Sequence, residues 1–275
     1  MVRVTVPRIV LPKEQPAKET MENGENGLDG KVVAITGGGR GIGRGIADHL
    51  AARGARIAII DVDSTSAEAA AAAIKSARPY TCDITREDQV VPAFEAIAAD
   101  FGRLDVLVNN AGIFRDAQLV NAKGGQVRSK ASAEEFDLVI DVCLRGAFLC
   151  AREAAARIIE TGTDGGVIVN ISSGAFRGNF GQTNYSAAKA GLVAMSRVWA
   201  KELGRHGIRS MVIAPGAIET DLLMSMPKDA LEGMARQIPL RRIGRIENVA
   251  RATAHIIEND YLTGSIVEVN GGMTV

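Results

Sequence analysis

Short apolar runs alternate with helix-length segments from Lys31 almost to the end of the chain. Each run is rich in β-branched side chains and is bounded by Gly, Asn, Asp or Pro, a pattern typical of parallel strands buried on both faces. The predicted strands are Val32–Thr36, Arg56–Asp61, Val106–Asn109, Val167–Ile171, Arg209–Ala214 and Ile266–Val269. The expected helices include Ile42–Arg53, Ala67–Ala73 and Tyr185–Leu203. This alternation predicts one doubly wound α/β (Rossmann) domain, with a parallel sheet of about seven strands and helices on both faces.

The first 28 residues do not share this pattern. Their polar part, Lys13–Gly27, is rich in Glu, Lys, Pro, Asn and Gly and has neither helical nor strand periodicity. We expect an N-terminal extension over residues 1–28, either a loose tail or an arm packed on a neighbouring subunit, followed by the single α/β domain over residues 29–275.

Composition and charge narrow the class of protein. Of the 275 residues, 47% are hydrophobic and 23% charged, as in soluble globular proteins. The 32 basic and 32 acidic side chains cancel, which argues against a nucleic-acid or anionic-membrane partner. No apolar stretch is long enough to cross a bilayer, and Met1–Pro12 lacks the apolar core of a signal peptide. Three scattered cysteines, Cys82, Cys143 and Cys150, predict neither a disulfide framework nor a metal site, and a cytoplasmic setting is expected.

A glycine-rich turn joins the first strand to the first helix. It runs from Thr36 to Gly43, with glycines at 37, 38, 39, 41 and 43. Glycine lets the backbone turn tightly and approach a pyrophosphate, whose charge is stabilised by the helix N-terminus. We therefore expect a dinucleotide to bind at Gly37, Arg40, Gly41, Ile42 and Gly43.

Two charged residues bear on which dinucleotide binds. Asp61 ends the second predicted strand, 18 residues after Gly43, where a carboxylate would accept hydrogen bonds from the adenosine ribose and repel a 2′-phosphate. Arg40 has the opposite effect, because a guanidinium there would pair with that phosphate. A fixed like charge costs more than a flexible arginine gains, so NAD is predicted over NADP.

Several motifs follow one another in a fixed order. They are Thr36–Gly43, Cys82–Ile84, Asn109–Gly112, Ser172-Ser173, Tyr185–Lys189 and Pro215–Thr220. Together they resemble the short-chain dehydrogenases/reductases over nearly all of Leu28–Met273. The resemblance implies a nicotinamide cofactor and hydride transfer to or from a secondary alcohol or ketone.

The resemblance also implies roles for individual cofactor-binding residues. Asp83 and Ile84 would flank the adenine, and Asn110, Ala111 and Gly112 would lie under the cofactor after the preceding strand. The remaining expected contacts are Pro215, Gly216, Ile218 and Thr220, of which the last two would hold the nicotinamide carboxamide.

Tyr185 and Lys189 are the candidate proton-transfer pair. They are four residues apart, so on a helix both face the same direction. A free tyrosine has a pKa near ~10. A nearby ammonium and an oxidised nicotinamide would lower that pKa and let the phenol exchange a proton with an alcohol oxygen. Lys189 would also reach the nicotinamide ribose. Both Tyr185 and Lys189 are therefore counted among the expected cofactor contacts. The cofactor itself carries the hydride.

A serine at the end of the preceding strand is expected to hold the substrate oxygen. The usual spacing of the family, 13 residues before Tyr185, selects Ser172. Alignment of the strand Val167–Ile171 selects Ser173 instead. Strand register is stiffer than loop length, so Ser173 is favoured and Ser172 stays open.

Cys143 is the largest departure from the family pattern, which has asparagine at this position to hold a water that relays protons to the lysine. A thiol is a weak hydrogen-bonding group and does not reproduce an amide. A nucleophilic role would need an activating base, and the sequence places no histidine to provide one. Cys143 is therefore interpreted as a small packing residue.

The substrate is inferred from further resemblance. Gly178–Tyr185, Leu144–Gly146, Pro239–Gly244 and Asn270–Met273 resemble the branch that handles 3-oxoacyl and (3R)-hydroxyacyl thioesters. A lid is expected at residues 221–236, and Ala117–Ala131 is expected near the pocket mouth, with Gly124-Gly125 giving mobility.

Three functions are compatible with these features. The first is a dehydrogenase or reductase of a 3-hydroxyacyl thioester, or of a steroid or cyclic alcohol. The second is an NAD-binding protein with little turnover, for which Cys143 is the only support. The third is chemistry on a bound nucleotide sugar, although such relatives usually have a longer C-terminal substrate domain. The resemblance further implies a homotetramer built from helix faces and the last strand.

Overall fold

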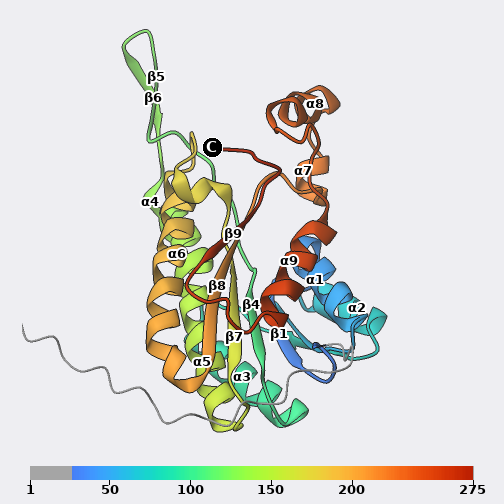
Figure 1. The fold of residues 1–275 in the computed structure, drawn as a ribbon. Coiled ribbons are helices and arrows are strands. Elements are labelled where there is room, and N and C mark those ends of the chain that lie inside the picture. Colours follow the sequence, from blue (N-terminus) through green and yellow to red (C-terminus); the bar gives the residue numbers. More distant parts are fainter. Residues whose placement is uncertain (1–26, 275) are drawn as a thin grey trace, which may run out of the picture.

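The computed structural model describes residues 27–274, and the sequence prediction of a doubly wound α/β fold is confirmed. All seven strands of the main sheet are parallel, in the order β3-β2-β1-β4-β7-β8-β9 (Figure 1). The strands are β1 Val32–Thr36, β2 Arg56–Asp61, β3 Ala77–Thr81, β4 Val106–Asn109, β7 Gly166–Ile171, β8 Ile208–Pro215 and β9 Ile266–Val269.

Helices cover both faces of this sheet (Figure 1). One face packs against α1 Gly41–Ala51, α2 Ser64–Ala73 and α9 Ile246–Glu258. The other packs against α3 Glu87–Phe101, α5 Gly146–Glu160 and α6 Thr183–Leu203. The other α-helices within residues 27–274 are α4 Ala133–Ile140, α7 Asp221–Met224 and α8 Lys228–Gln237. No helix within residues 27–274 is long and apolar enough to span a membrane.

The predicted strands exist within one residue of their expected ends, but β3 was not predicted. Its sequence, Ala77–Thr81, is polar and mostly exposed and contains Pro79. Pairing with β2 places it at the edge of the sheet, where proline is tolerated and little side-chain burial is needed. The apolar pattern that reveals buried strands is therefore missing.

The packed domain begins slightly earlier than expected. Leu28, which the sequence interpretation placed in the extension, is fully buried in the cluster that joins α1 and α9 to the sheet. The rest of the predicted extension, apart from Gly27, lies outside the described residues.

The segment expected near the pocket mouth contains a separate hairpin. Strands β5 Val120–Lys123 and β6 Gln126–Lys130 pair antiparallel and project from the molecule (Figure 1). Gly124 and Gly125 both have positive φ, 62° and 75°, the conformation that a tight two-residue hairpin turn needs. The two glycines therefore define a turn.

Candidate active site

The predicted site residues other than Tyr185 and Lys189, which lie on α6, are found near the carboxyl ends of the parallel strands. Gly37 follows β1, Asp61 ends β2, Asn110 follows β4, Ser172 follows β7 and Gly216 follows β8. Because these strands are parallel, their carboxyl ends meet at one edge of the sheet, where ligands bind in open α/β folds. The topology thus brings distant parts of the chain to one site.

The glycine turn forms a tightly packed cradle at the start of α1. Gly37 has φ of 61°, and a Cβ on Gly43 would collide with the Gly37 carbonyl oxygen. Arg40 precedes α1 without capping it through its side chain, so the first N–H groups of the helix remain available to an anion. The cradle therefore fits the pyrophosphate of a dinucleotide.

Thr36 and Asn110 hold the cradle in shape. The Thr36 hydroxyl accepts hydrogen bonds from the backbone nitrogens of Asn110 (3.0 Å) and Ala111 (3.1 Å). The Asn110 amide donates to the carbonyl oxygens of Thr36 and Gly37, both at 3.0 Å. Asn110 thus supports the cradle through its side chain, and Thr36, which was not among the predicted contacts, does the same.

Asp61 lies at the rim of the cradle. One carboxylate oxygen accepts from the Gly39 nitrogen at 3.0 Å, and the other accepts from the Asp63 nitrogen at 3.2 Å. Arg40 is exposed, and its charge lowers the pKa of Asp63 as a minor contribution beside the Ser66 hydrogen bonds. The Asp61 carboxylate is therefore fixed at the cradle.

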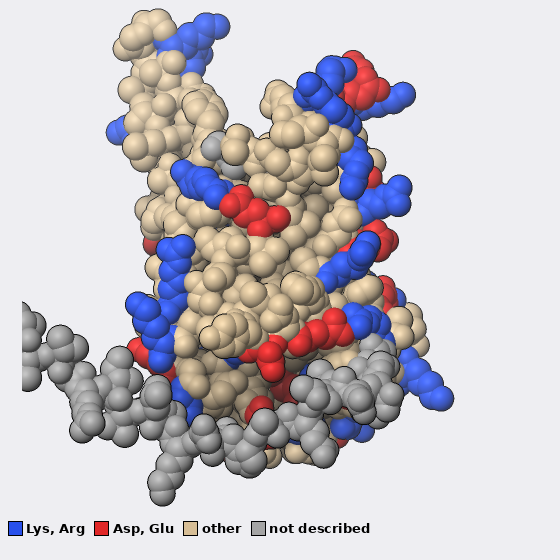
Figure 2. Space-filling model, in the orientation of Figure 1, with Lys and Arg blue, Asp and Glu red and all other residues tan. Residues whose placement is uncertain are grey.

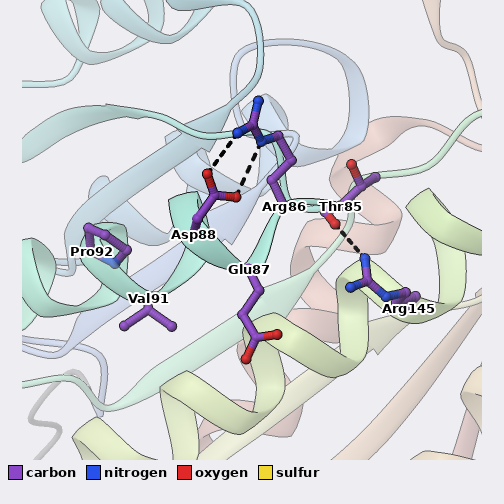
Figure 3. Close-up of a pocket in the computed structure, with 7 residues that line it drawn as sticks. All are labelled: Thr85, Arg86, Glu87, Asp88, Val91, Pro92 and Arg145. Carbon is purple, nitrogen blue, oxygen red and sulfur yellow. Dashed lines mark hydrogen bonds and ion pairs between the residues drawn. The ribbon is translucent and has the colours of Figure 1, made fainter.

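The expected adenine-side residues are held by local contacts. The Asp83 carboxylate accepts from the Thr85 nitrogen (3.0 Å) and hydroxyl (2.8 Å), and the Ile84 side chain packs in the core beside Gly146. Next to them, Figure 3 shows a surface hollow between the start of α3 and Arg145, whose guanidinium donates to the Thr85 carbonyl.

The expected nicotinamide-side residues follow β8. The Gly216 nitrogen donates to the Val269 carbonyl at 3.0 Å, so it belongs to the sheet ladder just past Pro215. Ile218 is buried beside Gly244, and Thr220 caps α7 by accepting from the Leu223 nitrogen at 3.3 Å. These contacts tie the start of the expected lid to the sheet.

Tyr185 and Lys189 lie in the first two turns of α6, and both are buried, with 6% and 3% of their surface exposed. The Lys189 ammonium donates to the Ile171 carbonyl at 2.8 Å and lies 5.5 Å from the centre of the Tyr185 ring. Burial lowers the pKa of Lys189 and raises that of Tyr185. Burial thus raises the pKa of the Tyr185 phenol, whereas the positive charge of Lys189 was expected to lower it.

The two serines face different partners. Ser173 is half-buried, its hydroxyl accepts from the Ala175 nitrogen at 3.2 Å, and its hydrogen bond to Tyr185 counteracts the rise in the tyrosine pKa. Ser172 is buried and donates to the Lys189 carbonyl oxygen at 3.1 Å. Ser173 therefore lies beside the phenol, whereas Ser172 anchors α6 to the sheet.

Phe114 is a site residue that sequence reasoning missed. Its ring packs on the Tyr185 ring in a tilted arrangement, with centroids 4.6 Å apart and planes at 47°, and it remains 43% exposed. The Asn184 amide donates to the Arg115 carbonyl at 2.9 Å and so fixes the segment that carries Phe114. A contact between residues this far apart in sequence leaves no pattern in a single chain.

Cys143 lies in a π-helical turn, Asp141–Arg145, that joins α4 to α5. It is 1% exposed and packs with Tyr185 and Ala188, as expected for a packing residue. Within residues 27–274, no group of three or more His, Cys, Asp or Glu side chains is placed to hold a metal ion.

The cradle, the buried Tyr185–Lys189 pair and the half-buried serine define a nicotinamide-dependent oxidoreductase that acts on alcohol or keto groups. Residues 37–274 match the family model described as enoyl-(acyl carrier protein) reductase. The chain is 38% identical to a 3-oxoacyl-[acyl-carrier-protein] reductase of Thermotoga maritima over 90% of its length and 99% of that protein. It is also 38% identical to the human 3-oxoacyl-[acyl-carrier-protein] reductase and 37% identical to carbonyl reductase family member 4 of Xenopus tropicalis, each over 88% of this chain and 98% of the relative. The chain belongs to the short-chain dehydrogenase/reductase family.

Proposed function

We propose that the protein interconverts 3-oxoacyl and 3-hydroxyacyl thioesters. The observation that carries this proposal is the placement of Tyr185 and Ser173 together at the edge of the sheet that holds the dinucleotide cradle. The names of the relatives, which specify 3-oxoacyl-[acyl-carrier-protein], support the substrate class.

Each side chain of the site has a separate role in this reaction. Ser173 holds the substrate oxygen, and Tyr185 gives it a proton during reduction or takes that proton during oxidation. A bound nicotinamide supplies or accepts the hydride. Lys189, fixed by the Ile171 carbonyl, places a positive charge near the phenol and stabilises its deprotonated form. Phe114 packs on the Tyr185 ring and limits how a substrate approaches it.

For the cofactor we propose NAD rather than NADP. A dinucleotide would be held by the cradle and by the residues that follow β3, β4 and β8, as the family resemblance implies. The Asp61 carboxylate, fixed by the Gly39 nitrogen, would accept from the ribose hydroxyls and repel a 2′-phosphate. NADP would need the exposed Arg40 to offset that repulsion.

We further propose that residues 221–236 act as a lid, that the protein is a homotetramer and that it works in the cytoplasm. Exposed Leu222 and Met224 on the short helix α7, and exposed Met226 between α7 and α8, support an adaptable apolar lid. The edge strand β9 and the exposed Phe148 on α5 offer surfaces for subunit contacts. Three buried free thiols suit a reducing compartment.

The test is coenzyme oxidation and reduction with a panel of 3-oxoacyl and 3-hydroxyacyl thioesters, steroids and cyclic alcohols. We expect thioesters to have the highest kcat/KM. Tyr185→Phe should lower kcat by roughly 10²–10⁴-fold and should weaken coenzyme binding far less, because it removes only the phenol hydroxyl. A higher kcat/KM with steroids or cyclic alcohols would replace the substrate class, and tight coenzyme binding without turnover on any substrate would indicate a nucleotide-binding protein.

A further inference from the structure

The β5–β6 hairpin carries an unbalanced positive charge. From Ala117 to Ala133 the chain has three basic residues, Lys123, Arg128 and Lys130, and no Asp or Glu, although the whole chain has zero net charge. Within residues 27–274 none of these three side chains forms an ion pair. Figure 2 shows basic and no acidic atoms on this projection, whereas the opposite projection carries both.

The hairpin is also fully solvated. Every residue of both strands is exposed, including Val120 at 49% and Val127 at 58%. An isolated two-stranded hairpin is at best marginally stable in water. Apolar and cationic side chains on such an element are a combination that suits a protein partner, since apolar contact gives affinity and charge gives steering.

The base of the hairpin is anchored to the active site. The Ala117 nitrogen donates to the Gly181 carbonyl at 2.8 Å, and the Gln182 amide donates to the Asp116 carboxylate at 2.9 Å. Gly181 and Gln182 directly precede α6, whose first turn carries Tyr185. The base of the hairpin is therefore tied to the start of the helix that carries the reacting group, and a hollow separates the hairpin from the α7–α8 projection (Figure 2).

We propose that this hairpin is a docking arm for an acidic carrier protein that presents the acyl thioester. The inference rests on the proposed thioester function. A thioester that reaches Tyr185 through the hollow leaves its carrier outside, next to the hairpin. Each strand extends roughly 10 Å from the base at the usual rise per residue. Lys123, which lies next to the turn, therefore contacts a macromolecular surface more readily than a small phosphate group at the pocket rim.

The test uses a charge-reversal variant, Lys123→Glu/Arg128→Glu/Lys130→Glu, in the full chain. The matched control is Lys75→Glu/Lys201→Glu/Arg205→Glu, which makes the same change in net charge at three exposed positions outside the site. Three 3-oxoacyl substrates are compared: the acyl group on an acyl carrier protein, on coenzyme A and on N-acetylcysteamine, which is neutral and small. Binding of the unacylated carrier protein is measured separately by fluorescence anisotropy.

We expect the hairpin variant to raise KM for the carrier-protein substrate and to weaken carrier binding, each by roughly tenfold or more. The salt dependence of KM should disappear as well. Turnover of the N-acetylcysteamine thioester should stay within about twofold of wild type, and the control should match wild type throughout.

Unchanged carrier binding in the hairpin variant would overturn the proposal, as would an equal loss with the N-acetylcysteamine thioester, which would assign the hairpin to the pocket. A loss of activity confined to the coenzyme A thioester would indicate that the hairpin binds a small phosphate-bearing carrier and not a protein. A wild-type enzyme that binds the carrier without reducing any thioester would refute the proposed function and leave the docking arm intact.

Discussion

The Cys143 sulfur lies 3.4 Å from the backbone nitrogen of Ile113 and 3.6 Å from its carbonyl oxygen. One thiol thus accepts and donates a hydrogen bond, and it joins the π-helical turn to the segment that carries Phe114. The contact adds to the packing role expected from the sequence, because the thiol also positions the chain beside Tyr185.

Removing this contact should lower both the free energy of unfolding and kcat. We expect Cys143→Ala to lower the free energy of unfolding by about 1 kcal/mol, through a small cavity and two weak hydrogen bonds lost. It should also reduce kcat, because Phe114 and the Tyr185 ring lose their support. Cys150→Ala is the control, since Cys150 is equally buried in the core between α3 and α5 and should cost stability alone. Urea unfolding and steady-state kinetics measure both effects; equal kcat in the two variants would contradict this role.

A Cys143→Asn variant that turns over faster than wild type would show that the missing amide limits the proton relay.

Ser173→Ala and Ser172→Ala should differ in their effects on kcat/KM and on the free energy of unfolding. Ser173→Ala removes the hydroxyl beside the phenol, so kcat/KM should fall by roughly 10²-fold with little change in stability. Ser172→Ala removes a buried bond to the Lys189 carbonyl, so it should cost about 1 kcal/mol of stability and leave most of the activity. The reverse pattern would assign the substrate contact to Ser172.

Coenzyme preference should depend on Asp61. Replacing it by serine removes the carboxylate at the cradle rim while Arg40 stays, so the ratio of kcat/KM for NADPH to that for NADH should rise by roughly tenfold or more. Glu68→Ser on α2 is the control, because it removes an exposed acid near the cradle but outside it. Initial rates with NADH and NADPH measure this ratio of kcat/KM. A wild-type enzyme that already prefers NADPH would refute the NAD assignment.

The buried ammonium of Lys189 should make stability depend on pH. Its pKa in the folded protein lies below the ordinary 10.5 because of burial, so between the two values the unfolded chain binds more protons than the folded one. The contribution of Lys189 to the stability of the wild type then rises with pH across that interval. Lys189→Met lacks this group, so the variant should gain stability relative to wild type at neutral pH, and the gain should shrink as the pH approaches 10.5. Loss of the bond to the Ile171 carbonyl is independent of pH and shifts the difference by a constant. Urea unfolding of both proteins between neutral and alkaline pH measures this difference, and parallel curves would show that burial does not lower the pKa of Lys189 in the folded protein.

The sequence alone determined the fold class, the family and the reaction type. Buried parallel strands need continuous apolar runs, a phosphate cradle needs glycine, and a proton-transfer pair on one helix face needs four-residue spacing, and each of these demands is met locally along the chain. The roles assigned to Asp83, Ile84, Ile218 and Thr220 are predictions carried by family resemblance.

The tertiary structure decided what depends on neighbours distant in sequence. Edge pairing makes a strand of Ala77–Thr81, whose own sequence is polar. The direction of β7 and the position of α6 turn Ser173 toward the phenol and Ser172 toward the helix backbone. Burial raises the pKa of Tyr185 although Lys189 lies one turn away. Stacking, burial and the direction of a side chain are properties of the packed molecule, because they depend on which segments the fold brings into contact.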